Sequence, residues 1–286
     1  HDYDVATAAR PETVKKLFPH THDTGILHGT VTVATEDGAI EVTTYREEGR
    51  YSDNRRPDSV NFLSEINGDL SRRDFTVNAI AYSPKRGLYD PFSGCKDLEK
   101  RLLRTVGDPE KRFGEDALRI LRLFRFRAQL SFTIEEETRS AALRLMPTLS
   151  HISRERIFAE LMKLLEYADF AALSEARPVF ETVMPQITLS DETLKSVSAC
   201  GTLSGKWARL CGAHTAEILT ALHAPRALIL SAGELAAYQK GAHIVHDVAK
   251  LKHTNKEDFF AFLGDVSAAE AWQAAKEKGV PTSRCE

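Results

Sequence analysis

Two carboxylates stand at alternate positions near the start of the chain. Asp2 and Asp4 flank Tyr3. If this segment is a strand, both acids lie on one face, while Tyr3 and Val5 point to the other. Carboxylates this close repel each other unless a cation lies between them, and Mg²⁺ prefers carboxylate oxygens as ligands. The pair therefore predicts a Mg²⁺ site formed by Asp2 and Asp4, against the alternative of a solvated turn.

A third carboxylate, Glu41, lies in a segment of β-branched and aromatic residues at 39–45. This composition favours a strand in which Ile40 and Val42 share one face and Glu41 lies on the other. If this strand pairs beside the first, three carboxylates converge. Such a cluster is typical of two-metal phosphoryl or nucleotidyl transfer, in which one ion activates a hydroxyl and the other holds a triphosphate. The alternative is an edge-strand acid in solvent.

A second group of polar residues lies at 72–79, with the sequence Arg-Arg-Asp-Phe-Thr-Val-Asn-Ala. Arginine side chains can hold phosphates in a fork geometry, and Asp74 or Asn78 can bond a ribose hydroxyl. Arg73, Asp74 and Asn78 are therefore candidate nucleotide contacts. The alternative is a helix N-terminus with surface ion pairs.

A helical pattern at 115–126 contains a possible base-reading pair, Asp116 and Arg119, at positions i and i+3. Cytosine and adenine present an amino donor beside a ring-nitrogen acceptor, whereas guanine and uracil present a carbonyl beside an N–H. A carboxylate beside a guanidinium would accept C and A and reject G and U. The alternative is an intrahelical salt bridge. Arg122 and Arg125 continue along the helix and can reach phosphates.

The composition determines how these residues can be positioned. With 286 residues, 42% of them hydrophobic and 28% charged, the chain can form two or three domains. Its net charge of −3 implies that any nucleic-acid site is a local patch. The four cysteines show no paired spacing, so neither a zinc ribbon nor a disulfide framework is indicated, which fits a reducing cytosol. No apolar run is long enough to cross a membrane.

The patterns predict particular elements around the candidate site. A short helix at 11–18 precedes a hairpin of two strands, Val31–Thr35 and Ile40–Tyr45, whose Asp-Gly turn signature supports the pairing that carries Glu41. Residues 46–60 combine charges with Gly and Pro, which predicts a mobile loop, either a lid or a linker. Residues 90–98 read as a turn and a short helix of architectural role. Helical stretches at 215–224, 227–239 and 257–263 suggest an all-helical second half.

Together these motifs resemble the bacterial class II tRNA nucleotidyltransferases, the CCA-adding enzymes of the polynucleotide adenylyltransferase group. The resemblance covers residues 1–166 in order. It rests on the Asp-x-Asp pair, the strands at 28–33 and 41–46, RRDFTVNA at 72–79, DPFSG at 90–94, EDALRILR at 115–122 and HISRER at 151–156.

The resemblance implies roles for individual residues. Asp2 and Asp4 would bind Mg²⁺, and Arg73 and Asp74 would contact the nucleotide. Asp116 and Arg119 would act as an amino-acid template for C and A, with Arg122 and Arg125 as further contacts. These eight residues and Asn78 form the predicted site together with Glu41, a third carboxylate expected to orient or deprotonate the primer 3′-hydroxyl.

Further features of the chain lie outside these motifs. The glycine-rich phosphate turn that precedes the Asp-x-Asp pair in the family is absent, and a chain opening on His1 without Met suggests that an upstream segment is missing. The family's flexible loop, needed for A addition, corresponds to residues 46–60, so the retained stretch predicts that A can be added. His246-Asp247 resembles the doublet of metal phosphohydrolases, but the other ligands of that site are lacking, so we interpret it as coincidence.

The sequence thus predicts an α+β protein. A nucleotidyltransferase-type head with a mixed sheet at 1–102 precedes a neck with the template helix at 103–166 and a helical, tRNA-binding body and tail at 167–286. The predicted activity is template-independent addition of CCA to the acceptor arm of tRNA from CTP and ATP, in the cytoplasm and without a membrane. The alternatives are a poly(A) polymerase, a CC-only or A-only relative, and an inactive RNA-binding module.

Overall fold

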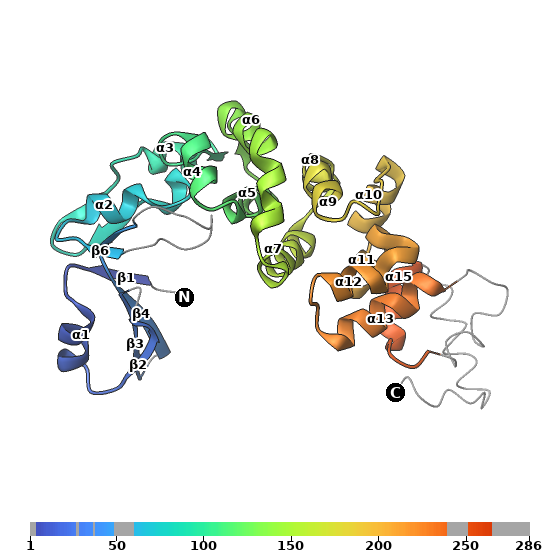
Figure 1. Ribbon diagram of the computed structural model, residues 1–286, viewed down its shortest axis with the longest axis horizontal. Coiled ribbons are helices and arrows are strands. Elements are labelled where there is room, and N and C mark those ends of the chain that lie inside the picture. The colour runs from blue at the N-terminus through green and yellow to red at the C-terminus, as the bar shows by residue number, and fades with distance from the viewer. Residues whose placement is uncertain (1–3, 27–28, 37, 49–59, 239–250, 265–286) are drawn as a thin grey trace. The chain divides into compact units, whose positions relative to one another are not determined.

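The computed structural model describes residues 4–26, 29–36, 38–48, 60–238 and 251–264. The chain divides into two compact units, one comprising 1–119 with 133–145 and the other 120–132 with 146–286. All strands of the described residues belong to the first unit, and the second is helical (Figure 1). The predicted α+β fold, a mixed sheet followed by helices, is confirmed. The division at 1–102, 103–166 and 167–286 stays a prediction.

The first unit contains the strands and several short helices. Its strands are β1 (Asp4–Thr7), β2 (Thr21–Gly25), β3 (Thr30–Thr35), β4 (Gly38–Thr44), β5 (Arg46–Glu48), β6 (Val60–Phe62), β7 (Ala81–Ser83), β8 (Gly87–Tyr89), β9 (Leu102–Leu103) and β10 (Thr133–Ile134). Its helices are α1 (Pro11–Leu17), α2 (Ile66–Ser71), the 3₁₀ helix η2 (Thr76–Asn78), α3 (Gly94–Glu99), α4 (Pro109–Glu115) and α6 (Glu136–Leu145). Helix α5 (Leu118–Leu130) begins here and continues into the second unit.

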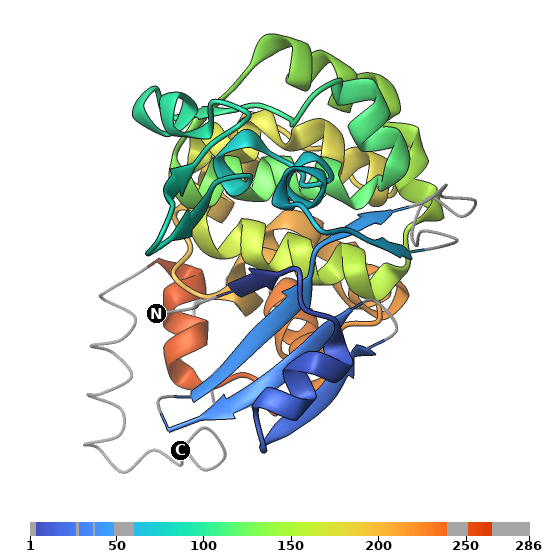
Figure 2. The same ribbon diagram turned by 90° about the vertical axis from the view of Figure 1, so that its left-hand side faces the viewer.

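The candidate site is built on a four-stranded sheet with the order β1-β4-β3-β2. β1 runs parallel to β4, whereas β3 pairs antiparallel with both β4 and β2. The predicted hairpin of β3 and β4 is therefore confirmed. Helix α1 covers one face, where Val14 packs with the buried side chains of Val31, Val33 and Val42 (Figure 2). Burial of this face leaves the opposite one for polar side chains.

Helix α1 has the sequence signals of a short helix. Pro11 occupies its first turn, where the missing N–H is not needed for a helical hydrogen bond. Glu12 lies in the first turn and Lys15 and Lys16 in the last, so each charge opposes the nearby end of the helix dipole. The predicted helix is confirmed, and it positions the sheet by packing Val14 into the core.

Turns with polar side chains hold the remainder of the first unit. The carboxylate of Asp90 accepts hydrogen bonds from the N–H groups of Gly94 and Cys95, at 2.7 and 2.9 Å, and so organises the turn that starts α3. The predicted turn and short helix at 90–98 are confirmed. Leu70, Ala79 and Val106 form a small buried core near this turn, and Leu70 and Ala79 thereby anchor the segment at 72–79 near its two ends.

The second unit consists of short helices. These are α7 (Arg154–Tyr167), α8 (Phe170–Glu175), α9 (Arg177–Val183), α10 (Asp191–Ser198), α11 (Leu203–Cys211), α12 (Thr215–Ala221), α13 (Arg226–Ala237) and α15 (Lys256–Leu263), with 3₁₀ helices η3 (Met146–His151) and η4 (Gly212–His214). The helices predicted at 215–224, 227–239 and 257–263 are confirmed with slightly different ends. None of the helices in the described part of the chain combines the length and apolar character that a membrane span requires.

The second unit has a core of its own, centred on α11. Trp207 is fully buried and stacks on Phe158, with ring centroids 6.1 Å apart. The neighbouring Lys206 is also buried, and its ammonium group donates to the carbonyl of Leu165 at 2.6 Å, near the C-terminal end of α7. Burial lowers the pKa of Lys206. This lysine therefore holds two helices together and is not available to a ligand.

Candidate active site

The register of the sheet brings two of the predicted carboxylates together. Asp4 on β1 lies directly opposite Glu41 on the parallel strand β4. Register partners point to the same face of a sheet, and here that face is the one opposite α1, because Val42 points into the core. Both acids are exposed. The predicted pairing of the two strands is confirmed, and the oxygens of Asp4 and Glu41 open onto the same space.

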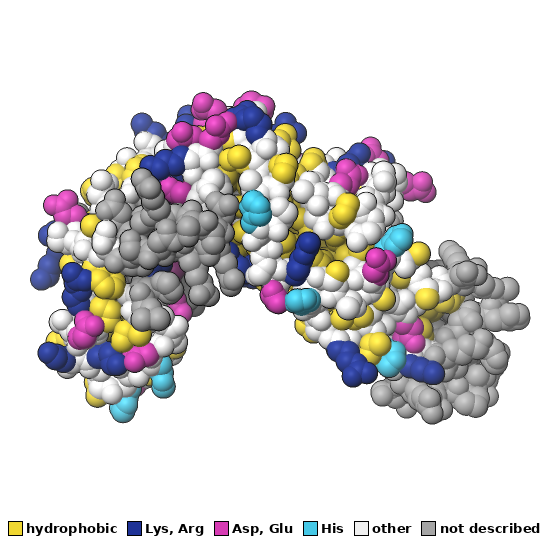
Figure 3. Space-filling model, viewed as in Figure 1, with side chains coloured by type: hydrophobic (Ala, Val, Ile, Leu, Met, Phe, Trp, Pro, Cys, Tyr) yellow, Lys and Arg dark blue, Asp and Glu magenta, His cyan; other side chains and the backbone are white. Residues whose placement is uncertain are grey.

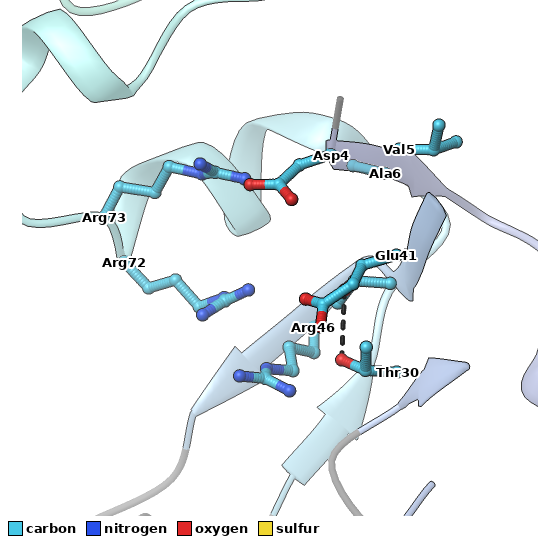
Figure 4. A pocket seen from close by; sticks show the side chains of 9 residues that line it. Asp4, Val5, Ala6, Thr30, Glu41, Arg46, Arg72 and Arg73 are labelled. Carbon is cyan, nitrogen blue, oxygen red and sulfur yellow. Dashed lines mark hydrogen bonds between the residues drawn. The ribbon is translucent and has the colours of Figure 1, made fainter. Parts of the chain in front are cut away.

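A pocket of about 230 Å³ lies over this part of the sheet. The carboxylates of Asp4 and Glu41 line it, and the basic side chains of Arg46, Arg72 and Arg73 complete it. The side chains of Arg72 and Arg73 point toward the carboxylates (Figure 4). On the visible face of the first unit, acidic and basic side chains are otherwise interspersed (Figure 3). The three arginines are thus a local concentration of positive charge beside two acids.

A buried carboxylate holds this group of arginines in place. Asp69 is 1% exposed, and its Oδ1 accepts from Nε and Nη2 of Arg72 at 3.1 and 2.7 Å. Its Oδ2 lies 3.9 Å from Nη2 of Arg73, and its Oδ1 lies 3.4 Å from the main-chain nitrogen of Arg46. A buried charge with several donors has little freedom to move. Asp69 therefore contacts all three arginines that line the pocket and limits their movement relative to one another.

Arg46, Arg72 and Asp69 were not among the site residues predicted from the sequence. Asp69 and the two following arginines stand at positions i, i+3 and i+4, the spacing at which helical side chains meet. That spacing was a usable signal for Arg72. Arg46 comes from β5, and no pattern in the sequence relates it to residues 69–73.

Asp74 and Asn78 occupy a different position from Arg73. Asp74 is 7% exposed, and its Oδ1 accepts from Nδ2 of Asn78 at 3.0 Å and from the N–H of Phe75 at 2.9 Å. The carbonyl of Asn78 accepts a longer bond from Nη1 of Arg73, at 3.4 Å. Neither Asp74 nor Asn78 lines the pocket. They stabilise the turn that carries Arg73, and their contact with a nucleotide stays a prediction.

The predicted template pair stands at a break between two helices. The prediction of a continuous helix at 115–126 is wrong at its start, because α4 ends at Glu115 and α5 begins at Leu118. Asp116 has extended backbone angles, and its Oδ1 accepts from the N–H of Leu118 at 3.0 Å. Aspartate favours this capping position, which satisfies an N–H at the start of a helix. Asp116 thus precedes the helix that contains Arg119.

Arg119 is 8% exposed and is held by three acceptors of the first unit. Its Nη1 donates to Oε2 of Glu115 and to the carbonyl of Arg112, at 2.7 and 2.8 Å. Its Nη2 donates to the carbonyl of Arg72 at 3.0 Å. This bond connects the helix of the predicted template to the segment that lines the pocket.

Arg122 and Arg125 lie further along α5, within the second unit. Arg125 is 7% exposed, and its Nε lies 2.6 Å from Oε2 of Glu160 on α7. Its guanidinium also lies 3.8 Å from the centre of the Phe126 ring, and that of Arg122 lies 5.1 Å from the same ring. Arg125 therefore joins α5 to α7. The predicted phosphate contacts of both arginines are not tested by this geometry.

Several predictions fall outside the described residues. They concern Asp2, residues 49–59 of the predicted loop and the doublet His246-Asp247. The prediction of a loop over 46–60 is wrong at its two ends, because residues 46–48 form β5 and residue 60 begins β6.

Known proteins similar to this chain supply an independent line of comparison. The family model "Poly A polymerase head domain" matches residues 1–104, and "Probable RNA and SrmB- binding site of polymerase A" matches 131–176. The CCA-adding enzyme of Geobacillus kaustophilus is 40% identical over 96% of this chain and 69% of its own length. That of Geobacillus thermodenitrificans is 42% identical over the same shares. This chain belongs to the CCA-adding enzyme family.

Solved structures agree with this membership. The crystal structure of the Bacillus stearothermophilus CCA-adding enzyme in complex with CTP is similar to this chain, with a TM-score of 0.76 and 30% identity. The match covers 97% of this chain and 73% of that one. The resemblance seen in the sequence motifs is therefore confirmed, and the likeness to CCA-adding enzymes extends into the helical second unit.

The donor set of the CCA-adding enzyme pocket fits a hard divalent cation. Asp4 and Glu41 contribute carboxylate oxygens from adjacent strands, and such oxygens suit Mg²⁺ better than nitrogen or sulfur ligands do. Among the described residues, no group of three or more His, Cys, Asp or Glu side chains could hold a metal ion.

Proposed function

We propose that this chain adds C, C and A to the 3′ end of tRNA from CTP and ATP, releasing pyrophosphate. The observation that carries the proposal is the position of Asp4 opposite Glu41, with three arginines lining the same pocket. Membership of the CCA-adding enzyme family supports it. Paired carboxylates beside arginines suit nucleotidyl transfer, because the carboxylates can hold a metal ion and the arginines can hold the phosphates.

The residues divide the chemical work. Asp2 and Asp4 would hold a divalent metal ion, which we propose to be Mg²⁺, and Glu41 would orient or deprotonate the primer 3′-hydroxyl. The bound ion would supply activation of the primer 3′-hydroxyl and neutralise charge on the phosphates. Arg72 and Arg73 point toward the carboxylates and would bind the triphosphate oxygens (Figure 4). Asp69 keeps those arginines oriented, so less freedom is lost when the nucleotide binds.

Base selection would come from Asp116 and Arg119. The carboxylate accepts from the exocyclic amino group of cytosine or adenine, and the guanidinium donates to the adjacent ring nitrogen. Uracil and guanine present the opposite pattern, and would leave both groups unsatisfied. In this role Arg119 would redirect some of its present hydrogen bonds toward the base. Arg122 and Arg125 would add phosphate contacts.

Two features bear on the cell compartment and the mode of binding. Cys95, Cys200 and Cys211 are free thiols, which supports a reducing environment, and we propose that the protein acts in the cytoplasm. We also propose that the helical second unit contacts the acceptor arm of tRNA, because one family model for an RNA-binding region extends into it.

A poly(A) polymerase is the second candidate, because the family model for residues 1–104 carries that name. The test is to sequence the 3′ ends that the full-length protein makes on tRNA lacking CCA. We expect products ending in CCA. Long A tracts would indicate a poly(A) polymerase, products ending in CC or in A alone would indicate a partial enzyme, and unchanged tRNA would indicate an RNA-binding module.

The buried anchor Asp69 leads to a testable result. Asp69→Asn keeps the shape of the side chain but removes the charge that holds Arg72 and Arg73. We expect the KM for CTP to rise roughly tenfold, since a charged hydrogen bond contributes about 1.5–3 kcal/mol. The Kd for tRNA should change little. Steady-state kinetics with varied CTP and filter binding of tRNA measure the two quantities.

Asp97→Asn provides a matched control for this substitution. Asp97 is equally buried, and its Oδ1 lies 2.6 Å from Nη2 of Arg104 in the same unit. Both variants should lower the melting temperature, because each removes one partner of a buried ion pair. Only Asp69→Asn should raise the KM for CTP. An equal rise in both variants would show that Asp69 serves the fold alone.

A further inference from the structure

The open face of the four-stranded sheet continues past the carboxylates as a line of polar side chains. Thr32 on β3 lies opposite Glu41, and His22 on β2 lies opposite Thr32. Register partners share a face, so Asp4, Glu41, Thr32 and His22 form one line across four strands, about 14 Å long. Thr24 belongs to the same face, because its Oγ1 lies 2.7 Å from Oγ1 of Thr32. We call His22, Thr24 and Thr32 the Thr–His row.

The Thr–His row is accessible and has free hydrogen-bonding capacity. His22 and Thr24 are exposed, and Thr32 is partly buried. Of two hydroxyls bonded to each other, one proton is used and the second remains available, together with several lone pairs. The other face of the same strands is apolar and covered by α1. The row is therefore a polar surface that begins at the carboxylates and leads away from them.

The direction of the reaction assigns a ligand to this surface. In nucleotidyl transfer the attacking and leaving oxygens lie on opposite sides of the phosphorus atom. In Figure 4, Arg72 and Arg73 face the carboxylates from one side, and Thr30 of β3, whose register partner on β4 is Thr43, lies on the other. Pyrophosphate leaves toward the arginines, because they carry the charge that binds it. The RNA strand that supplies the attacking 3′-hydroxyl must then approach over the β-strands β4 and β3.

We propose that the Thr–His row binds the last nucleotides of the RNA primer, next to its attacking 3′-hydroxyl. The inference rests on the proposed function, because it takes the carboxylates as the reaction centre. RNA presents phosphate oxygens, which accept from the Thr hydroxyls and the His22 ring. It also presents 2′-hydroxyls, which both donate and accept. Hydroxyl and ring N–H groups can exchange one acceptor for another, which suits an RNA end that must be repositioned after each addition.

Thr32→Val tests the proposal in the full chain, because valine has the shape of threonine without the hydroxyl. We expect the KM for tRNA lacking CCA to rise about fivefold, the loss of one hydrogen bond of about 1 kcal/mol. The KM for CTP should stay unchanged. His22→Ala should act in the same direction. Thr21→Val is the matched control, because Thr21 lies on β2 opposite Val33, on the face covered by α1.

A modified primer separates contact from a structural effect. tRNA with 2′-deoxyribose at its last two positions should bind the wild-type protein more weakly than normal tRNA. In Thr32→Val and His22→Ala the difference in affinity between normal and deoxy tRNA should be smaller, because these variants already lack the contact with the 2′-hydroxyl. A melting curve for each variant shows whether it is folded. If Thr32→Val does not fold, His22→Ala still tests the proposal, because His22 is exposed and its substitution leaves the core intact.

The outcomes are distinct. A KM for tRNA within about twofold of wild type in both variants, against the fivefold expected for one hydrogen bond, would overturn the proposal. So would an equal rise in the KM for CTP, or an undiminished penalty for the deoxy primer. Failure of the wild-type protein to extend any tRNA would instead overturn the proposed function, and it is visible before any variant is measured.

Discussion

Asp4→Ala should lower the rate of nucleotide addition by roughly a thousandfold or more, while the Kd for tRNA stays nearly unchanged. The carboxylate of Asp4 lies opposite Glu41 and is one of the two described acids that line the pocket. Metal coordination contributes several kcal/mol of transition-state stabilisation, and each 1.36 kcal/mol is a factor of about ten in rate. Single-turnover incorporation of radiolabelled CTP measures the loss.

Asp23→Ala is the matched control for this variant. Asp23 is an exposed aspartate of the same sheet, and its carboxylate is ion-paired with Lys15 of α1 at 2.9 Å. Surface pairs of this kind contribute little to stability. We expect the control to retain wild-type turnover. A rate for Asp4→Ala within about tenfold of wild type, only 1.36 kcal/mol, would remove Asp4 from the reaction centre.

Asp116→Ala should relax base selection in favour of U and G. The variant would lose the acceptor that we propose to recognise the amino groups of cytosine and adenine and to disfavour a carbonyl edge. A good bidentate contact contributes about 1–3 kcal/mol of discrimination, so the preference for CTP over UTP should fall roughly tenfold to a hundredfold. Competition between CTP and UTP, followed by sequencing of the tRNA 3′ ends, measures the ratio of incorporation.

The capping role of Asp116 requires a control of its own. Asp108 caps the preceding helix, α4, and its side chain accepts from the N–H groups of Glu110 and Lys111. Loss of either cap should destabilise the protein by about 1 kcal/mol. Asp108→Ala should therefore match Asp116→Ala in melting temperature but keep full selectivity. If both variants keep selectivity and lose rate alike, Asp116 serves only to start α5.

The position of the two carboxylates was predictable because it depends on short-range rules. Alternation along a strand separates Glu41 from Ile40 and Val42, and β-branched residues favour the strand itself. The Asp-Gly turn signature paired β4 with β3, and the structure places β1 on the other side of β4. The rules say which face each side chain takes. They do not give the order of the strands, which depends on how the strands pack in the folded chain.

Other parts of the site were not predictable from local patterns. The helical periodicity at 115–126 hid the break before Leu118, because a capping aspartate and a helical aspartate look alike in sequence. Arg46 reaches the pocket from β5, and Asp69 contacts its main chain across 23 residues. Such contacts depend on tertiary packing. Periodicity describes one element at a time and carries no information about which elements meet.

The hydrogen bond from Arg119 to the carbonyl of Arg72 affects how incorrect nucleotides are rejected. Through this bond, the guanidinium that we propose to read the base is attached to the main chain of the residue whose side chain we propose to bind the triphosphate. An ill-matched base that pulls Arg119 out of place therefore disturbs the peptide that aims Arg72. Small misalignments of reacting groups slow chemistry steeply. Incorrect nucleotides should thus be rejected mainly by slow turnover after they have bound, a kinetic form of fidelity that needs no separate editing site.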